Sequence, residues 1–240
     1  MYKRQHKNRA ITIWDYEHLI LEKFPKVYKV KCVNHTSFDG TITDYSETAP
    51  GHVSLVVIAN VQNKNAVDPL RPLASLDQLS EIASFVDKIK PPCVTLHVKN
   101  PIYEEITVDF KVKFNAGIDA GYYISKLREE IKHFLSPWSS DCTTDIVFGG
   151  RIHKSVILNF VEERSYVDYV TCFKMFHIVK DNSSISIKEV DEALAQTSVS
   201  IIGSAKTHII EEIAARETDQ CKCDDNIIVS TEALTAIDNC

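Results

Sequence analysis

Side chains capable of nucleophilic and proton-transfer chemistry come close together in one polar segment of the sequence. Cys142 is flanked by Asp141 and Asp145, and His153 follows a short distance downstream. A cysteine beside a base can act as a nucleophile. Residues 139–145 are nevertheless dominated by serine, threonine and aspartate, which favour turns and loops. We therefore interpret this segment as a polar loop and not as a catalytic centre.

The histidines and cysteines are spaced too irregularly for a metal site on one helix. No two of the nine histidines lie three or four residues apart, which is the spacing that puts two ligands on one helix face. His208 with Glu211 resembles half of a zinc-binding helix, but the second histidine is missing. Cys221 and Cys223 form the only close cysteine pair, and a zinc site needs further ligands.

Some histidines fall instead in predicted strands, namely His52, His97 and His177. In a strand, a histidine most simply makes a hydrogen bond or lies at the surface. We therefore expect no catalytic, cofactor-binding or metal-binding residues, although metal ligands contributed by separate strands stay open.

The composition excludes several classes of protein. The chain has 240 residues and a net charge of −6, with hydrophobic and charged fractions of 44% and 25% that are ordinary for a folded domain. It has only seven glycines and neither a Gly-x-Gly-x-x-Gly nor a Gly-Lys-Ser/Thr motif, so nothing supports a dinucleotide or P-loop site. General binders of a phosphate backbone are usually basic, so we expect no nucleic-acid partner.

The sequence also lacks the signals of a membrane or secreted protein. Its longest uninterrupted apolar stretch, residues 55–59, is far shorter than the about 20 residues that cross a bilayer, so we expect no membrane insertion. The first residues are basic, but no apolar core of a secretory signal follows them. The seven cysteines are odd in number and scattered, which is typical of reduced thiols in the cytoplasm.

Amphipathic helices are predicted in the first part of the chain. Thr12 and Asp15 fit a capping box, and apolar residues at helical spacing follow them. Ser75 and Gln78 fit a second capping box, and the apolar face of the helix that follows is expected to start at Leu76. Each helix should pack its apolar face on a sheet.

Strands between these helices predict a ferredoxin-like α+β domain over residues 1–100. The run 52–61 is the most β-rich of the chain and is expected to be a central strand. A short leading strand at 9–13 would complete the order β-α-β-β-α-β of a ferredoxin-like sandwich. The other expected strands are 27–33 and 93–98.

A second, related α+β domain is predicted over residues 101–180, with an antiparallel sheet covered on one face by two helices. Residues 106–114 alternate apolar and polar side chains, the pattern of a strand with one wet face. A helix that ends at Pro137 follows. The remaining expected elements are a strand at 146–148, a helix at 152–161 and a long strand at 166–178.

Residues 181–240 are expected to be a partly mobile C-terminal extension. A strand at 198–202 and a short helix at 206–216 are the regular elements predicted within it. From Glu217 onward the chain is acidic, with six acidic residues against one lysine.

Short motifs recur in a recognisable order along residues 8–178. Residues 9–17 fit the pattern R-x-x-T-x-x-D-Y-E, and residues 25–27 fit P-x-V. Further stretches of the same kind are 101–114, 148–155 and 167–170. This ordered set resembles the C-terminal portion of baseplate J-like proteins, which are wedge components of contractile phage tails and related contractile injection systems.

The resemblance implies a structural role without catalysis. Members of that family assemble into baseplate wedges around the central hub and spike and help couple baseplate change to sheath contraction. The implied partners are other wedge subunits, the hub, spike and sheath–tube assembly and, as a further candidate, another copy of this chain. The implied location is a phage tail-like particle assembled in the cytoplasm. Family members are usually longer, and the stretch after Lys180 has no counterpart among their motifs.

Aromatic and basic residues are the natural candidates for assembly contacts, because tryptophan, tyrosine and arginine are enriched at interfaces. The alternative function is a ferredoxin-like binding module for a small ligand or nucleic acid, since such sandwiches host these functions. The candidate interface residues are Arg4, Arg9, Trp14, Trp138, Tyr166 and Tyr169.

Overall fold

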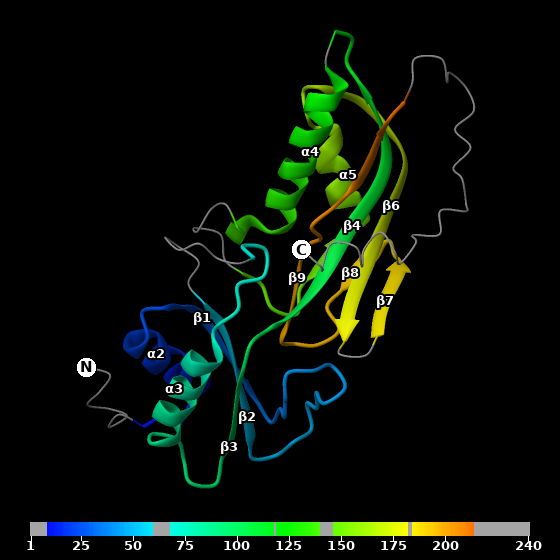
Figure 1. Ribbon diagram of the computed structural model, residues 1–240. Helices are drawn as coiled ribbons and strands as arrows, with labels where there is room; N and C mark the ends of the chain where they lie inside the picture. Colours follow the sequence, from blue (N-terminus) through cyan, green and yellow to red (C-terminus); the bar gives the residue numbers. More distant parts are fainter. Residues whose placement is uncertain (1–8, 60–67, 118, 140–145, 182–183, 214–240) are drawn as a thin grey trace.

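The structure is a computed structural model, and its fold is α+β, as predicted (Figure 1). It carries a three-stranded sheet with helices α2 and α3, followed by a five-stranded sheet with helices α4 and α5. We call residues 9–100 the first unit and residues 101–213 the second unit. None of the described helices combines the length and hydropathy that a membrane-spanning helix requires. The described residues are 9–59, 68–117, 119–139, 146–181 and 184–213.

The helices of the first unit begin where their capping residues predict. α2 (Ile13–Lys23) follows Thr12, whose Oγ1 accepts a hydrogen bond from the Asp15 N–H. The Asp15 carboxylate in turn accepts one from the Thr12 N–H at 2.7 Å. This reciprocal capping box satisfies donors that the first turn leaves free. α3 (Leu76–Asp87) follows Ser75, whose Oγ accepts a hydrogen bond from the backbone N–H three residues later.

The first sheet has the strand order β1-β2-β3, with β2 in the centre as expected. β1 (Val27–Asn34) pairs antiparallel with β2 (His52–Ala59), and β2 pairs parallel with β3 (Thr95–Lys99). The leading strand suggested at 9–13 does not form, because this segment caps α2 and leaves Ile11 61% exposed. The unit therefore has the order α-β-β-α-β, and the predicted ferredoxin-like order is incomplete, because the first strand is missing and β3 pairs directly with β2.

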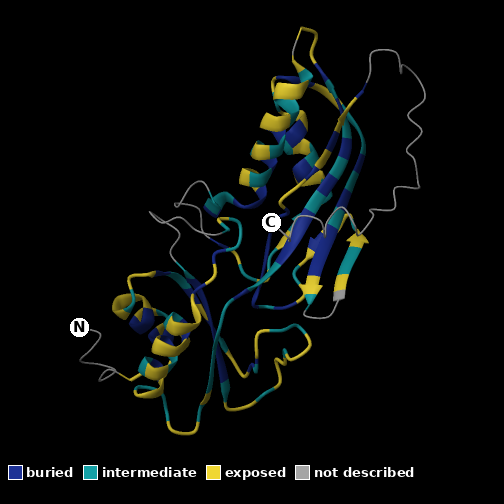
Figure 2. Ribbon diagram, viewed as in Figure 1, coloured by how far each residue is buried: buried dark blue, intermediate teal, exposed yellow. Residues whose placement is uncertain are grey.

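The second unit is organised around the long strand β4 (Ile102–Phe114). β4 pairs antiparallel with β6 (Val167–Asp181), which pairs antiparallel with β7 (Ser184–Glu189). Alternate apolar residues of β4 are buried beneath α4 (Ala120–Leu135) and α5 (Lys154–Glu162), and the alternation is visible in Figure 2. The predicted antiparallel sheet with helices on one face is thus present in β4, β6 and β7.

Residues beyond Lys180 complete this second sheet. β9 (Ser200–Ser204) and β10 (Ile209–Glu212) both pair parallel with β4, on the edge opposite to β6. The strand predicted at 198–202 is confirmed by β9. The helix predicted at 206–216 is wrong over its described part, because Ile210 enters the second core as a strand residue paired with Phe110 of β4.

The connection between α4 and α5 also departs from the sequence prediction. A short 3-10 turn, η1 (Pro137–Ser139), follows α4. The strand expected at 146–148 does not form there, and the strand comes later as β5 (Arg151–His153), which pairs with β8 (Glu192–Leu194). Gly149 explains the delay, since its φ of 62° is a left-handed turn conformation that glycine adopts most readily.

The described cysteines lie in different environments. Cys32 is buried in β1, and burial raises the pKa of its thiol to about 12, so it behaves as a small hydrophobic residue. Cys93 is exposed and free. Cys172 has a φ of 53° in a bulge of β6 and is disulfide-bonded, so the expectation of reduced thiols is wrong at this position. The remaining cysteines, Cys142, Cys221, Cys223 and Cys240, lie outside the described residues.

Candidate interaction surfaces

The side chains considered for catalysis do not converge among the described residues. His153 precedes α5 and is half exposed, with its Nε2 at 3.5 Å from Glu192 Oε1. His208 is buried in the second unit, whereas Glu211 is exposed on β10. Cys142 lies outside the described residues. Within the described ranges, no group of three or more His, Cys, Asp or Glu side chains could hold a metal ion.

The two units pack together through the face of β2 that points away from α2 and α3. Val56 and Ile58 of β2 are fully buried on this face, while Leu55 and Val57 are fully buried in the core with the helices. β2 is therefore covered on both sides. We call this contact the junction, and its other buried apolar residues are Phe38, Trp138, Ile146, Val199 and Ile201.

Hydrogen bonds between the units reinforce the junction. The donor–acceptor pairs are Lys29 Nζ to the Ile146 carbonyl at 2.7 Å, Tyr103 Oη to the Pro72 carbonyl at 2.9 Å, and Trp138 Nε1 to the Leu70 carbonyl at 3.3 Å. Gly203 makes room for the indole, because a Cβ at this position would lie 3.2 Å from the Trp138 ring. These polar groups at the border of the apolar contact thus all have hydrogen-bond partners.

An ion-pair network lies at one edge of the junction. Glu105 of β4 is 6% exposed and pairs with Arg71 of the first unit and with Lys180 Nζ of β6, which lies 3.3 Å away. Arg71 Nε lies 4.0 Å from Asp68 Oδ2. A buried carboxylate that loses a cation is strongly destabilising, so this network favours one relative position of the two units.

The neighbouring residue Glu104 forms a second buried network, within the second unit. Its Oε2 lies 2.7 Å from Nε2 of His177 on β6, and its Oε1 accepts a hydrogen bond from the Gln196 N–H at 2.9 Å. Glu104 is fully buried and His177 nearly so. The carboxylate therefore links β4 to β6 and to the segment that precedes β9.

His208 is a buried polar group beneath α4. Its Nδ1 lies 3.4 Å from the Val108 N–H, and its Nε2 lies 2.9 Å from Ser204 Oγ. Nδ1 thus accepts and Nε2 donates, as in a neutral imidazole. β4 pairs with β9 up to Ile106 and with β10 from Asp109, so Val108 has no strand partner on this edge. The His208 ring accepts the hydrogen bond that a strand carbonyl would otherwise accept. Burial, aided by the charges of Lys132 and Arg128, lowers the pKa of His208 to about 4.

The structure separates the predicted interface residues by exposure. Trp138 and Tyr166 are 9% and 6% exposed, so within this chain they serve the interior. Trp14 and Tyr169 are 45% and 44% exposed and can be reached by a partner. Arg9 is also exposed, and Arg4 lies outside the described residues. That these residues contact a partner in an assembly stays a prediction. Their exposure makes Trp14 and Tyr169 the stronger candidates for such a contact.

An apolar face of α2 is exposed to solvent. Trp14, His18 and Leu21 follow one another at helical spacing, and the Trp14 ring stacks on His18 with ring centroids 3.7 Å apart. Ile11, just before the helix, adds a side chain that is 61% exposed. Contiguous exposed apolar side chains often mark contact sites. We call these four residues the α2 face.

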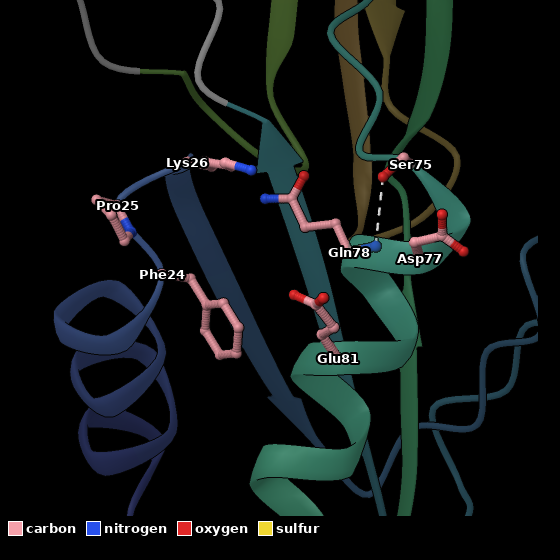
Figure 3. A pocket seen from close by; sticks show the side chains of 7 residues that line it. All are labelled: Phe24, Pro25, Lys26, Ser75, Asp77, Gln78 and Glu81. Atoms are coloured by element: carbon pink, nitrogen blue, oxygen red, sulfur yellow. Dashed lines mark hydrogen bonds between the residues drawn. The ribbon is translucent and has the colours of Figure 1, made fainter.

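A shallow groove lies between the end of α2 and the start of α3 (Figure 3). Phe24 and Lys26 contribute its wall on the α2 side, and Asp77, Gln78 and Glu81 contribute the α3 side. The Nε2 atom of Gln78 is buried and lacks a hydrogen-bond partner within the described residues. Small-molecule sites are usually deeper and more apolar, so this open, mixed-charge groove suits a protein contact better.

Sequence reasoning missed the most exposed large apolar side chain near α3. Leu76 is 82% exposed although helical spacing predicted it on the apolar face, and Leu73 before it is 58% exposed. Leu76 is the first residue of α3, and the buried residues of this helix begin only at Leu79. The capping residue Ser75 was the available signal, because a first-turn position is frequently exposed.

Comparison with known proteins gives a family and a fold. Residues 2–202 match the family described as baseplate protein PVC11-like. No curated protein sequence matches the chain. A chain in the cryo-EM structure of the anti-feeding prophage (AFP) baseplate, 6-fold symmetrised, is similar with a TM-score of 0.55 and 18% sequence identity. The similarity covers 84% of this chain but 39% of that chain, so this chain spans less than half of its relative's length.

These findings carry different weight. At 18% identity, the structural likeness shows a shared fold, and fold alone does not fix function. The family match is the stronger finding, because it spans both units and ends within β9. The chain therefore belongs to the family of PVC11-like baseplate proteins.

Proposed function

We propose that the chain is a structural wedge subunit in the baseplate of a contractile injection system. The observation that carries this proposal is its membership of the PVC11-like baseplate family. The shared fold with a chain of the AFP baseplate supports a particle of the same kind. The motifs that resemble baseplate J-like proteins support the finer assignment to a wedge.

In this role the protein works through its surfaces. The junction joins both units into one block, which can transmit a displacement from one partner to another. The exposed α2 face and Tyr169 are the contacts that we assign to neighbouring subunits. The partners are other wedge subunits and the hub, spike and sheath–tube assembly, with another copy of this chain as a further candidate. No catalytic step is part of this proposal.

Coupling to sheath contraction places a thermodynamic condition on these contacts. A subunit can help to switch a baseplate between two states only if its contacts differ in free energy between them. A specific contact of this kind should bury roughly 1,000 Å² or more. The exposed aromatic residues are suited to such contacts because a few buried aromatic anchors carry much of the binding energy.

Complementation in source cells that lack the chain tests the proposal. Particles would be purified and imaged by electron microscopy after expression of the wild type, Trp14→Ala, Tyr169→Ala or the control Tyr122→Ala. Tyr122 is 62% exposed but is not among the predicted contacts. We expect no complete baseplates without the chain, several-fold fewer with each interface variant, and wild-type numbers with the control. Complete, contracting particles in cells without the chain would contradict the proposal.

A further inference from the structure

Histidines that are far apart in the sequence meet on neighbouring strands of the first sheet. His52 is the first residue of β2, and His97 lies in the middle of β3. The parallel register pairs His97 with Ser54, two residues after His52, so both imidazoles lie on the same face of the sheet. His52 Nδ1 and His97 Nε2 are 2.9 Å apart, and the ring planes differ by 15°.

A carboxylate lies close to the second of these rings. Asp39 Oδ1 lies 3.3 Å from His97 Nδ1, on the side of the ring away from His52. Asp39 follows Phe38, whose fully buried side chain anchors the loop against the junction. The negative charge beside Nδ1 favours a proton on this nitrogen, which leaves the lone pair of Nε2 for His52. Histidines that bind metals commonly have this arrangement of carboxylate and imidazole.

We propose that His52 and His97 form a binding site for a divalent transition-metal ion, with Asp39 as the group that orients His97. Imidazole nitrogen is a favoured ligand of Cu²⁺, Ni²⁺ and Zn²⁺. In the metal-free protein, one proton lies between the two facing nitrogens. On metal binding this proton gives way to an ion that lies beside the line joining the nitrogens, about 2.0–2.1 Å from each. The proton on His52 Nδ1 then moves through solvent to His52 Nε2, so the histidine binds as a neutral ligand through Nδ1.

The distance between the nitrogens indicates which ions fit. Two nitrogens bound at about 2.0–2.1 Å to one ion lie roughly 2.9–3.4 Å apart, for bond angles between 90° and tetrahedral. The observed 2.9 Å is a hydrogen-bond distance of the metal-free protein and lies at the lower end of this range, so the nitrogens need little change of separation for the square geometry that Cu²⁺ and Ni²⁺ prefer. Zn²⁺ would require the two rings to move slightly apart.

The site is open on one side. No third ligating side chain converges with these histidines within the described ranges, so the other coordination positions belong to water or to a residue of a neighbouring subunit. Asp39 is 62% exposed, which leaves a path from solvent to the histidines. The inference is independent of the proposed function, since it depends only on residues of the first unit.

Titration of the untagged full chain with Cu²⁺ tests the site, by calorimetry for affinity and by electron paramagnetic resonance for the ligands. We expect one tight site per chain, with a spectrum that shows two imidazole nitrogens. His52→Gln and His97→Gln should each weaken the affinity at least about tenfold, and Asp39→Asn should weaken it about tenfold through the orientation of His97. His153→Gln is the control. His153 also lies beside a carboxylate, but no second histidine faces it, so its replacement should leave the affinity unchanged.

Two results would overturn the proposal. One is an affinity that stays unchanged in both histidine variants. The other is a wild-type spectrum with one bound imidazole nitrogen or none. Circular dichroism of each metal-free variant shows whether it folds. If a variant does not fold, the wild-type spectrum decides the question, since it reports the number of bound nitrogens directly.

Discussion

The central strands of the two sheets are buried in different ways. β2 has a continuous run of buried residues, whereas β4 alternates buried and half-buried positions over most of its length. β2 lies between the helices of the first unit and the second unit, whereas β4 packs one face on its helices and leaves the alternate residues half-buried on the other. The first sheet is therefore used as an internal contact on both faces, while the second sheet keeps its polar residues on one face.

Loss of a large apolar side chain from the buried face of β4 should destabilise the protein most. Phe110 is 1% exposed and stacks on Phe173 with ring centroids 5.2 Å apart. Phe110→Ala should lower the free energy of unfolding by about 3–5 kcal/mol. The next residue, Lys111, is only half-buried on the other face of the strand. Lys111→Ala should change the free energy of unfolding by about 0.5 kcal/mol or less. Chemical denaturation of both variants checks this, and equal losses would contradict the one-sided burial of β4.

The next prediction concerns the two faces of β2. Leu55 lies in the core with the helices and Ile58 lies in the junction, and both are fully buried. Leu55→Ala and Ile58→Ala should each cost about 2–5 kcal/mol of unfolding free energy. If the junction were a loose contact, Ile58→Ala would cost about 1 kcal/mol or less, because the site could relax.

Acid should destabilise the second unit through His208. Its folded-state pKa of about 4 lies below the ordinary value of 6.5, so the unfolded chain binds the proton first as the pH falls. The stability is therefore fully present above pH 6.5 and is lost between pH 6.5 and 4, by about 3 kcal/mol. Denaturation at a series of pH values measures this slope.

The matched variants for this slope are His208→Gln and His133→Gln. Removal of His208 should flatten the dependence of stability on pH between 6.5 and 4. His133 is exposed on α4, so its replacement should leave the slope as in the wild type. A slope that persists in His208→Gln would show that another group is responsible.

Loss of one cation at the edge of the junction should destabilise the protein only modestly. Arg71→Met removes one cation from the buried Glu105, but Lys180 remains beside it. Because Arg71 is itself 25% exposed, we expect a loss of about 1–2 kcal/mol, less than for a fully buried pair. Lys154→Met is the control, since its pair with Asp191 is largely exposed and should contribute about 0–1 kcal/mol. Equal losses would mean that the network does not stabilise the junction.

The parts of the fold that could be predicted are those with local signals. α2 and α3 begin directly after the capping residues Thr12 and Ser75. These starts could be predicted because the capping residue and the apolar spacing that follows lie within a few residues of each other. Residues 206–216 could not be assigned in this way. Their apolar spacing also suits a helix, and only partners on β4 make Ile209–Glu212 a strand.

The candidate contacts show the same limit. Trp14 and Trp138 belong to a residue type that is common both in cores and at interfaces, so type alone cannot distinguish them. Exposure separates them, and exposure depends on the junction that buries Trp138. His52 and His97 likewise meet only through the register of β2 and β3, which the sequence does not encode locally.

The assignment to a baseplate can be tested by purifying the native protein from its source under mild conditions and identifying its neighbours by cross-linking mass spectrometry. We expect cross-links from both units to other baseplate subunits, including residues near the α2 face. We also expect cross-links across the junction within the chain. A chain that purifies alone as a monomer, or with a metabolite or RNA bound, would contradict the assignment as a baseplate wedge subunit.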